Sequence, residues 1–213
     1  SANKIKRLGT TIDDAPGEVF DKVAKMLNLP NFSGSEVEKF AKNGDQDRFS
    51  FPLPLVNKNH CDLSFSGLKS SVRRQIDKLV EKQSGLYVQD QRDICASFQK
   101  SMKLIFEKKT KKAIELFSKK SSGNDLSFSL AGGVAANKSI RKSLEALCKD
   151  LHVRFSAPPL DLCTDNGLMI AYAGSQIYLD GKEDNMDLAP RPRWPIDIDN
   201  KKSLGYGKRG RKV

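Results

Sequence analysis

The strongest local pattern that could do chemistry is a pair of glycines between an alternating apolar run and a helical one. Residues 130–137 read Leu-Ala-Gly-Gly-Val-Ala-Ala-Asn, with Gly132 and Gly133 at the centre. Adjacent glycines let a ligand approach the backbone closely, and the free amides at a helix start attract anions. A plain tight turn explains the glycines equally well. Asn137 could bond either a sugar hydroxyl of a ligand or a loop carbonyl.

Carboxylates form the other two candidate groups. Residues 13–21 place four carboxylates around one helix turn, more than capping requires, and Asp21 could accept hydrogen bonds from ligand hydroxyls. Compensation of the helix dipole together with solvation is the alternative explanation. Asp165, within the run Cys-Thr-Asp-Asn-Gly at 163–167, either caps a helix or binds a metal, although one carboxylate does not make a metal site.

Cysteine and histidine spacing argues against other kinds of site. The four cysteines contain no C-x-x-C pair and fit no zinc template, so we expect buried free thiols: Cys61, Cys95, Cys148 and Cys163. The two histidines, His60 and His152, are too far apart for a helical metal motif. No G-x-S-x-G motif supports a serine nucleophile.

Composition indicates a soluble globular protein with a positive balance. The chain has 213 residues and a formal net charge of +11, and about half of that excess lies in residues 201–213, which hold no acidic residue. We expect a solvated, flexible tail, with a phosphate anchor for RNA as the alternative. No apolar run is long enough to cross a membrane and no signal peptide is evident, so a cytoplasmic location is expected.

Alternating short strands and amphipathic helices predict an α/β protein. The expected helices begin near residue 13 or 14 with Pro16 in the first turn, at the Ser35/Glu38 capping pattern, and near residues 66, 90, 135 and 165. The expected strands are short and occupy residues 49–53, 126–130 and 152–156. Three prolines predict an extended segment at 190–195.

Five blocks, taken in order, resemble one family. They are Gly-Thr-Thr-Ile-Asp-Asp-Ala-Pro-Gly-Glu-Val-Phe-Asp-Lys at 9–22, Ser-Phe-Ser-Gly-Leu-Lys at 64–69, Ala-Gly-Gly-Val-Ala-Ala-Asn at 131–137, Cys-Thr-Asp-Asn-Gly-Leu-Met-Ile at 163–170 and Arg-Pro-Arg-Trp-Pro at 191–195. These resemble the DDAxGEAFDK, SFSGLK, AGGVxAN, CTDNxxMI and RPRWP blocks of the bacterial TsaD family. That family comprises the tRNA N6-adenosine threonylcarbamoyltransferases, once described as O-sialoglycoprotein endopeptidases.

The resemblance implies an actin-like, sugar-kinase-like ATPase fold of two lobes, of which this chain supplies mainly the second. Residues 1–163 then form the second lobe, including a helical insertion at about 13–120. Residues 164–200 form a returning helix and an extended segment, and residues 201–213 form the basic tail. The family's upstream H-x-x-x-H and S-G-G-H-T motifs are not in this sequence. We therefore expect a C-terminal portion that is inactive alone.

The resemblance also implies an activity and its residues. The family is an acyltransferase that moves threonylcarbamoyl from threonylcarbamoyl-adenylate to N6 of the adenosine 3′ of the tRNA anticodon. By position, five residues bind the adenylate or ATP: Asp21, Gly34, Gly132, Gly133 and Asn137. Asp165 corresponds to a ligand of a divalent metal, iron or zinc, that is implied for the whole enzyme.

Partners follow from the same resemblance. It implies tRNA, a homologous partner subunit and a small ATPase, with no membrane association. An exposed apolar interface is expected, and with it self-association. The alternative function is a non-catalytic nucleotide- or RNA-binding module on the same fold, favoured by the basic tail and by the lysines of residues 90–120.

Overall fold

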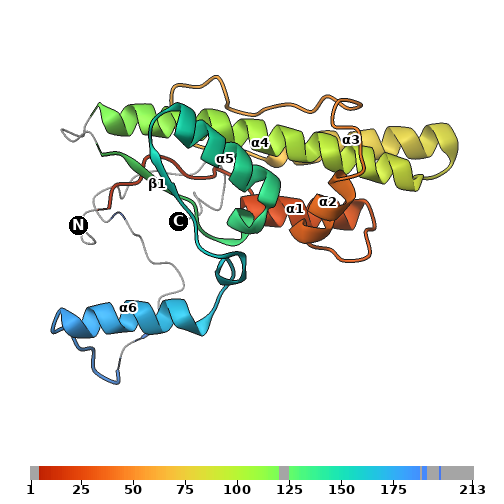
Figure 1. The fold of residues 1–213 in the computed structure, drawn as a ribbon. Coiled ribbons are helices and arrows are strands. Elements are labelled where there is room, and N and C mark those ends of the chain that lie inside the picture. The colour runs from red at the N-terminus through yellow and green to blue at the C-terminus, as the bar shows by residue number, and fades with distance from the viewer. Residues whose placement is uncertain (1–4, 120–124, 188, 191–196, 198–213) are drawn as a thin grey trace.

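The computed structural model describes residues 5–119, 125–187, 189–190 and 197. The expected extended segment at 190–195 and the basic tail therefore lie almost wholly outside the described residues. Within them the elements follow in this order: α1 (Pro16–Met26), α2 (Gly34–Ala41), α3 (Ser66–Gln83), α4 (Val88–Ser118), β1 (Ser127–Ser129), η1 (Gly133–Ala136), α5 (Lys138–Asp150), β2 (Arg154–Ser156), η2 (Leu160–Leu162) and α6 (Gly167–Leu179). Figure 1 shows a body dominated by helices. The fold is a mixed α/β one in which helix prevails.

The long helix α4 is the scaffold of the body. Its 31 residues extend about 45 Å at 1.5 Å per residue, and both α2 and α5 pack against it. Its apolar stripe supplies four fully buried side chains: Ile94, Phe98, Met102 and Ile105. The Phe98 ring meets the Phe20 ring of α1 edge to face, with centroids 5.0 Å apart. This contact anchors α1, whose apolar positions at i, i+3, i+4 and i+7 are buried as the sequence predicts.

The sheet in the described part of the chain consists of two short parallel strands. β1 pairs with β2 so that Phe128 lies opposite Phe155, and the two rings stack with centroids 6.2 Å apart. Helix α5 connects the strands and packs on α4 (Figure 1). The expected strands at 126–130 and 152–156 are confirmed, and the chain that leaves β1 enters the glycine turn directly.

The third expected strand is wrong. Residues 49–53 form no strand, and no neighbouring strand lies beside them in the described residues. Instead the Phe49 amide donates to Ser97 Oγ of α4 at 3.3 Å, and Phe51 is buried in the core. Pro52 and Pro54 remove two backbone donors, so this segment is held by side chains rather than by a ladder.

Three of the expected helix caps are also wrong. Ala15, not Asp13 or Asp14, precedes α1, because the Asp13 carboxylate is occupied by the Phe65 and Ser66 amides at the start of α3. Ser33, rather than Ser35, is the residue before α2.

The expected cap of α6, Asp165, is also wrong. The start of α6 is capped by Asn166, whose Oδ1 accepts from the Met169 amide at 3.0 Å. Asp165 is therefore not the cap of this helix.

Helix α6 stands apart from the helical body in Figure 1. None of its residues is buried within the described part of the chain, although its mean composition is strongly apolar. Its large apolar side chains are exposed: Leu168, Met169, Ile170, Tyr172, Ile177, Tyr178 and Leu179. No helix among the described residues combines the length and the apolar character that a bilayer crossing needs.

Candidate functional site

A cavity of about 300 Å³ brings together four separate parts of the sequence. Helix α1, the start of α2 and the turn after β1 form its walls, and Thr164 closes one side. Of the residues predicted to bind nucleotide, four line it: Asp21, Gly34, Gly133 and Asn137. Gly132 and Asp165 are not among its lining residues, although each adjoins one that is.

Asp21 lies on the exposed side of α1 and faces the start of α2. Its Oδ1 accepts a hydrogen bond from the Gly34 amide at 3.0 Å. Helix α2 has no capping hydrogen bond from its own Ser33, so Asp21 supplies the acceptor that an N-cap would normally provide. Asp21 Oδ2 makes no hydrogen bond within the described residues and is available to a ligand donor.

Gly34 sets how closely α1 and α2 approach each other. A Cβ placed on Gly34 would lie 3.1 Å from the Cβ of Phe20, closer than nine in ten real Cβ contacts. Its absence lets the Gly34 amide reach Asp21 across the helix pair. This glycine therefore shapes the cavity wall by permitting close packing.

The two glycines after β1 act differently from each other. Gly132 has φ of 85°, a backbone conformation that L residues with a side chain rarely adopt. A Cβ on Gly133 would meet no atom within 4 Å, because that position opens onto the cavity. The first glycine makes the turn, and the second keeps the backbone accessible.

Asn137 is the N-cap of α5. Its Oδ1 accepts from the Ile140 amide at 3.0 Å, and its Nδ2 donates to Gln99 Oε1 of α4 at 2.9 Å. The residue is 8% exposed. Within the described residues its partners are therefore a backbone amide and the Gln99 side chain, and not the loop carbonyl that the sequence suggested as one alternative.

Glu38 is a wall residue that sequence reasoning missed. It was interpreted as part of a capping box for its own helix. In the structure its Oε1 accepts from the Lys138 amide at 2.8 Å and from the Ser139 amide at 3.3 Å. The signal is misleading because an acidic residue at that spacing is typical of a local cap.

A metal site does not arise from the residues described. Asp165 is exposed, and no group of three or more His, Cys, Asp or Glu side chains in the described ranges is arranged to hold a metal ion. A metal at Asp165 would need further ligands from beyond those ranges.

Burial makes Cys95 and Cys148 poor candidates for a nucleophile. All four cysteines are buried and free, as expected. Burial raises the pKa of the Cys95 thiol to about 12 and raises the pKa of Cys148. A thiol with a raised pKa stays protonated near neutral pH and is a poor nucleophile.

Comparison with known proteins places the chain in a family. The model of the family "TsaD: tRNA N6-adenosine threonylcarbamoyltransferase" matches residues 1–172. A tRNA N6-adenosine threonylcarbamoyltransferase of Ruegeria pomeroyi is 48% identical over 210 residues, which cover 99% of this chain and 57% of the relative. One of Paracoccus denitrificans is 51% identical over 207 residues, covering 97% of this chain and 56% of the relative.

The matches cover most of this chain but only part of each relative. The family model covers well over half of the chain, and near-50% identity extends over almost all of it. The chain spans somewhat more than half the length of these curated relatives. The glycine turn, the start of α2 and α1 all fall within the matched region. The chain belongs to the TsaD family of tRNA N6-adenosine threonylcarbamoyltransferases.

Proposed function

We propose that this chain forms one side of the adenylate-binding cleft of a tRNA N6-adenosine threonylcarbamoyltransferase. The observation that carries the proposal is the convergence of Asp21, Gly34, Gly133 and Asn137 on a single cavity. These residues come from segments separated by up to about a hundred positions. The names of the relatives describe transfer of threonylcarbamoyl to N6 of a tRNA adenosine, and threonylcarbamoyl-adenylate is the donor that we propose for it.

Each wall residue has a role in this proposal. The free oxygen of Asp21 accepts from a ribose hydroxyl, and Gly133 lets the nucleotide lie against bare backbone. Asn137 acts by fixing the start of α5, since both polar atoms of its amide already have protein partners. The cavity, about 300 Å³, is at the small end of ligand sites. It suits the nucleoside part of the adenylate rather than the whole molecule.

The acyl-transfer step itself needs groups that stabilise charge on the carbamoyl oxygen. The described residues offer no metal-binding cluster for this. We therefore propose that this chain binds the nucleotide without catalysing transfer, and that the implied iron or zinc requires further ligands besides Asp165. A partner subunit and a small ATPase are proposed partners of the whole enzyme, and the cytoplasm is its proposed location.

The proposed division of the chain follows the actin-like fold. Residues 1–163 form the second lobe, with the helical insertion at about 13–120, and α6 within 164–200 is the returning helix. The exposed apolar surface of α6 supports this assignment, because such a surface is normally covered by another part of a protein or by a second copy.

Binding of ATP, measured by titration calorimetry, tests the pocket. Gly133→Val places a branched side chain at a cavity-lining position where an added Cβ would meet no atom within 4 Å, and we expect its methyl groups to occupy part of the cavity. Gly85→Val is the matched control, because it also meets nothing within 4 Å but lies in the α3–α4 connection. We expect Gly133→Val to weaken binding about tenfold or more, equivalent to about 1.4 kcal/mol, and Gly85→Val to leave it unchanged. Equal affinities for both variants would contradict the proposal.

A non-catalytic RNA- or nucleotide-binding module is the second candidate function. It is favoured by the net charge of +11 and by a basic groove described below. An assay with threonylcarbamoyl-adenylate and unmodified tRNA, with this chain as the only transferase, should give no product. Product formation would overturn the claim that the chain is inactive alone.

A further inference from the structure

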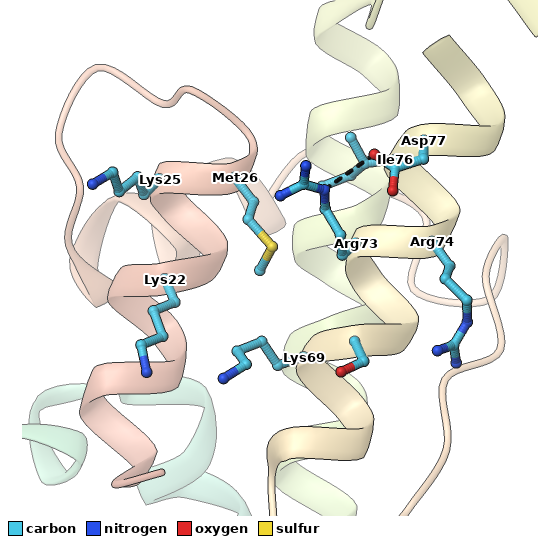
Figure 2. Close-up of a pocket in the computed structure, with 9 residues that line it drawn as sticks. Lys22, Lys25, Met26, Lys69, Arg73, Arg74, Ile76 and Asp77 are labelled. Atoms are coloured by element: carbon cyan, nitrogen blue, oxygen red, sulfur yellow. Dashed lines mark hydrogen bonds and ion pairs between the residues drawn. The ribbon is translucent and has the colours of Figure 1, made fainter. Parts of the chain in front are cut away.

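A second and larger cavity lies between α1 and α3, and we call it the α1–α3 groove. Its volume is about 790 Å³, and it is open to solvent. Basic side chains dominate its lining: Lys22, Lys25, Lys69, Arg73 and Arg74. Figure 2 shows Lys69 extending from α3 toward α1, with Lys22 and Met26 on the facing helix. Asp77 is the one acidic residue in the lining.

Ion pairs leave the groove with an excess of positive charge. Asp14 bonds both Lys22 and Lys69 at the end of the groove, and Arg73 bonds Asp77 at 3.1 Å. Lys25 and Arg74 make no ion pair within the described residues. The five basic residues thus outnumber Asp14, Glu18 and Asp77, the acidic residues that pair with them or line the groove.

The groove and the proposed nucleotide cavity share a wall. Gly17, Phe20 and Asp21 of α1 line the cavity, while Lys22, Lys25 and Met26 of the same helix line the groove. A helix with its side chains is about 10–12 Å across. A strand that lies in the groove therefore passes within about one helix diameter of the nucleotide cavity.

We propose that the α1–α3 groove binds the phosphodiester backbone of the RNA substrate; this rests on the proposed function. Lysine and arginine along both walls repeat at about one helical turn, so successive phosphates can each meet a cation. The lining contains no aromatic residue on which a base could stack. Contacts of this kind position an RNA without reading its sequence.

Fluorescence anisotropy with an unmodified tRNA transcript, from about 50 to 200 mM salt, tests the proposal. The groove variant is Lys25→Ala/Arg73→Ala. The matched control is Lys108→Ala/Lys111→Ala, which removes the same charge from two exposed lysines of α4 without an ion pair in the described residues. The groove variant should bind tRNA about tenfold more weakly. The slope of log K against log salt concentration should become shallower by about 2, one for each lost phosphate contact. The control should stay within about twofold of the unaltered chain.

Two outcomes would overturn the proposal that the groove binds RNA. One is an equal loss of tRNA affinity in the groove variant and in the control, which would mean that binding is spread over the whole charged surface. The other is no salt-dependent tRNA binding by the unaltered chain. Circular dichroism checks that both variants stay folded, and a charge-reversed Arg74→Glu variant gives a second reading without touching an ion pair.

The ATP titration separates this proposal from the proposed function. The groove variant should bind ATP as the unaltered chain does, because none of its substituted residues lines the cavity. If the unaltered chain binds ATP but the groove variant binds tRNA as tightly as the unaltered chain, only the groove proposal is contradicted. If the groove substitutions weaken tRNA binding but the unaltered chain does not bind ATP, only the proposed nucleotide site is contradicted.

Discussion

The Asp21 carboxylate accepts a hydrogen bond from the Gly34 amide at 3.0 Å, although thirteen residues separate them and they belong to different helices. Two of the five residues that the family resemblance assigned to a nucleotide are thus bonded to each other. Asp21 has a structural role as the cap of α2 and a proposed binding role through its second oxygen. The two roles can be separated by substitution.

Asp21→Asn keeps an acceptor for the Gly34 amide, whereas Asp21→Ala removes it. We expect the alanine variant to lose about 1 kcal/mol of unfolding free energy, the usual value of a capping bond, and the asparagine variant to lose clearly less. Both should bind ATP more weakly, since each loses the carboxylate. Urea denaturation and calorimetry give the two values. Equal destabilisation by both substitutions would show that the hydrogen bond is not the cause.

Gly132→Ala should destabilise the chain even though its Cβ would meet no atom within 4 Å. Its φ of 85° strains a residue with a side chain by about 1 kcal/mol or more. A protein of this size then melts about 2–4 °C lower. Gly133→Ala, which lacks the positive φ, is the control and should melt within about 1 °C of the unaltered chain. A normal melting temperature for Gly132→Ala would contradict the strain argument.

Much of the helical framework could be predicted from the sequence because apolar periodicity is a local property. The stripe of α1 and the long helix at 88–118 are examples. The caps could not be predicted, since Asp13 serves α3 and Glu38 serves α5. A local window of sequence cannot detect a partner fifty or a hundred residues away.

The candidate site shows the same limit. The resemblance named Asp21, Gly34, Gly133 and Asn137, which do line one cavity. It did not reveal that Asn137 is bonded to Gln99 and to a backbone amide. Those contacts depend on how α5 packs against α4, which a short sequence motif does not specify.

Arg48 holds two buried carboxylates, and removing it should destabilise the chain strongly. Its guanidinium bonds Asp93 at 2.7 Å and Asp90 at 2.6 Å, and both aspartates are 3% exposed. Arg48→Met leaves these charges without their cation, at a cost of about 3 kcal/mol. Arg48→Met/Asp93→Asn should recover part of that loss. Chemical denaturation gives the free energies of unfolding. A change below about 1 kcal/mol for the single variant would contradict the role of Arg48 in stabilising the two aspartates.

Acid should unfold the chain through carboxylates whose pKa values lie below the ordinary 3.8 in the folded state. Burial alone would raise the pKa of Asp13, but hydrogen bonds from Ser64, Phe65 and Ser66 outweigh burial and lower it. The pKa values of Asp90 and Asp93 are lowered despite burial, by their hydrogen bonds and by Arg48.

A carboxylate whose pKa is lower in the folded than in the unfolded chain stabilises the fold fully at pH values above its pKa in the unfolded chain. That stabilisation is lost as the pH falls through its pKa in the folded chain. The melting temperature should therefore drop steeply below about pH 4. Asp13→Asn should melt lower at pH 7 and lose less on acidification. A steeper loss of melting temperature on acidification in that variant would contradict a stabilising role for the ionised Asp13 carboxylate.

Glu38 ties α2 to the start of α5 across one hundred residues of sequence, and this has a consequence for the order of folding. During synthesis α2 leaves the ribosome long before Lys138 exists, so this wall of the cavity closes only after α5 has docked. Closing so long a loop costs entropy that only the finished core repays. The cavity is thus complete only once α5 has docked on α4. The proposed nucleotide would then stabilise the molecules in which both walls are in place.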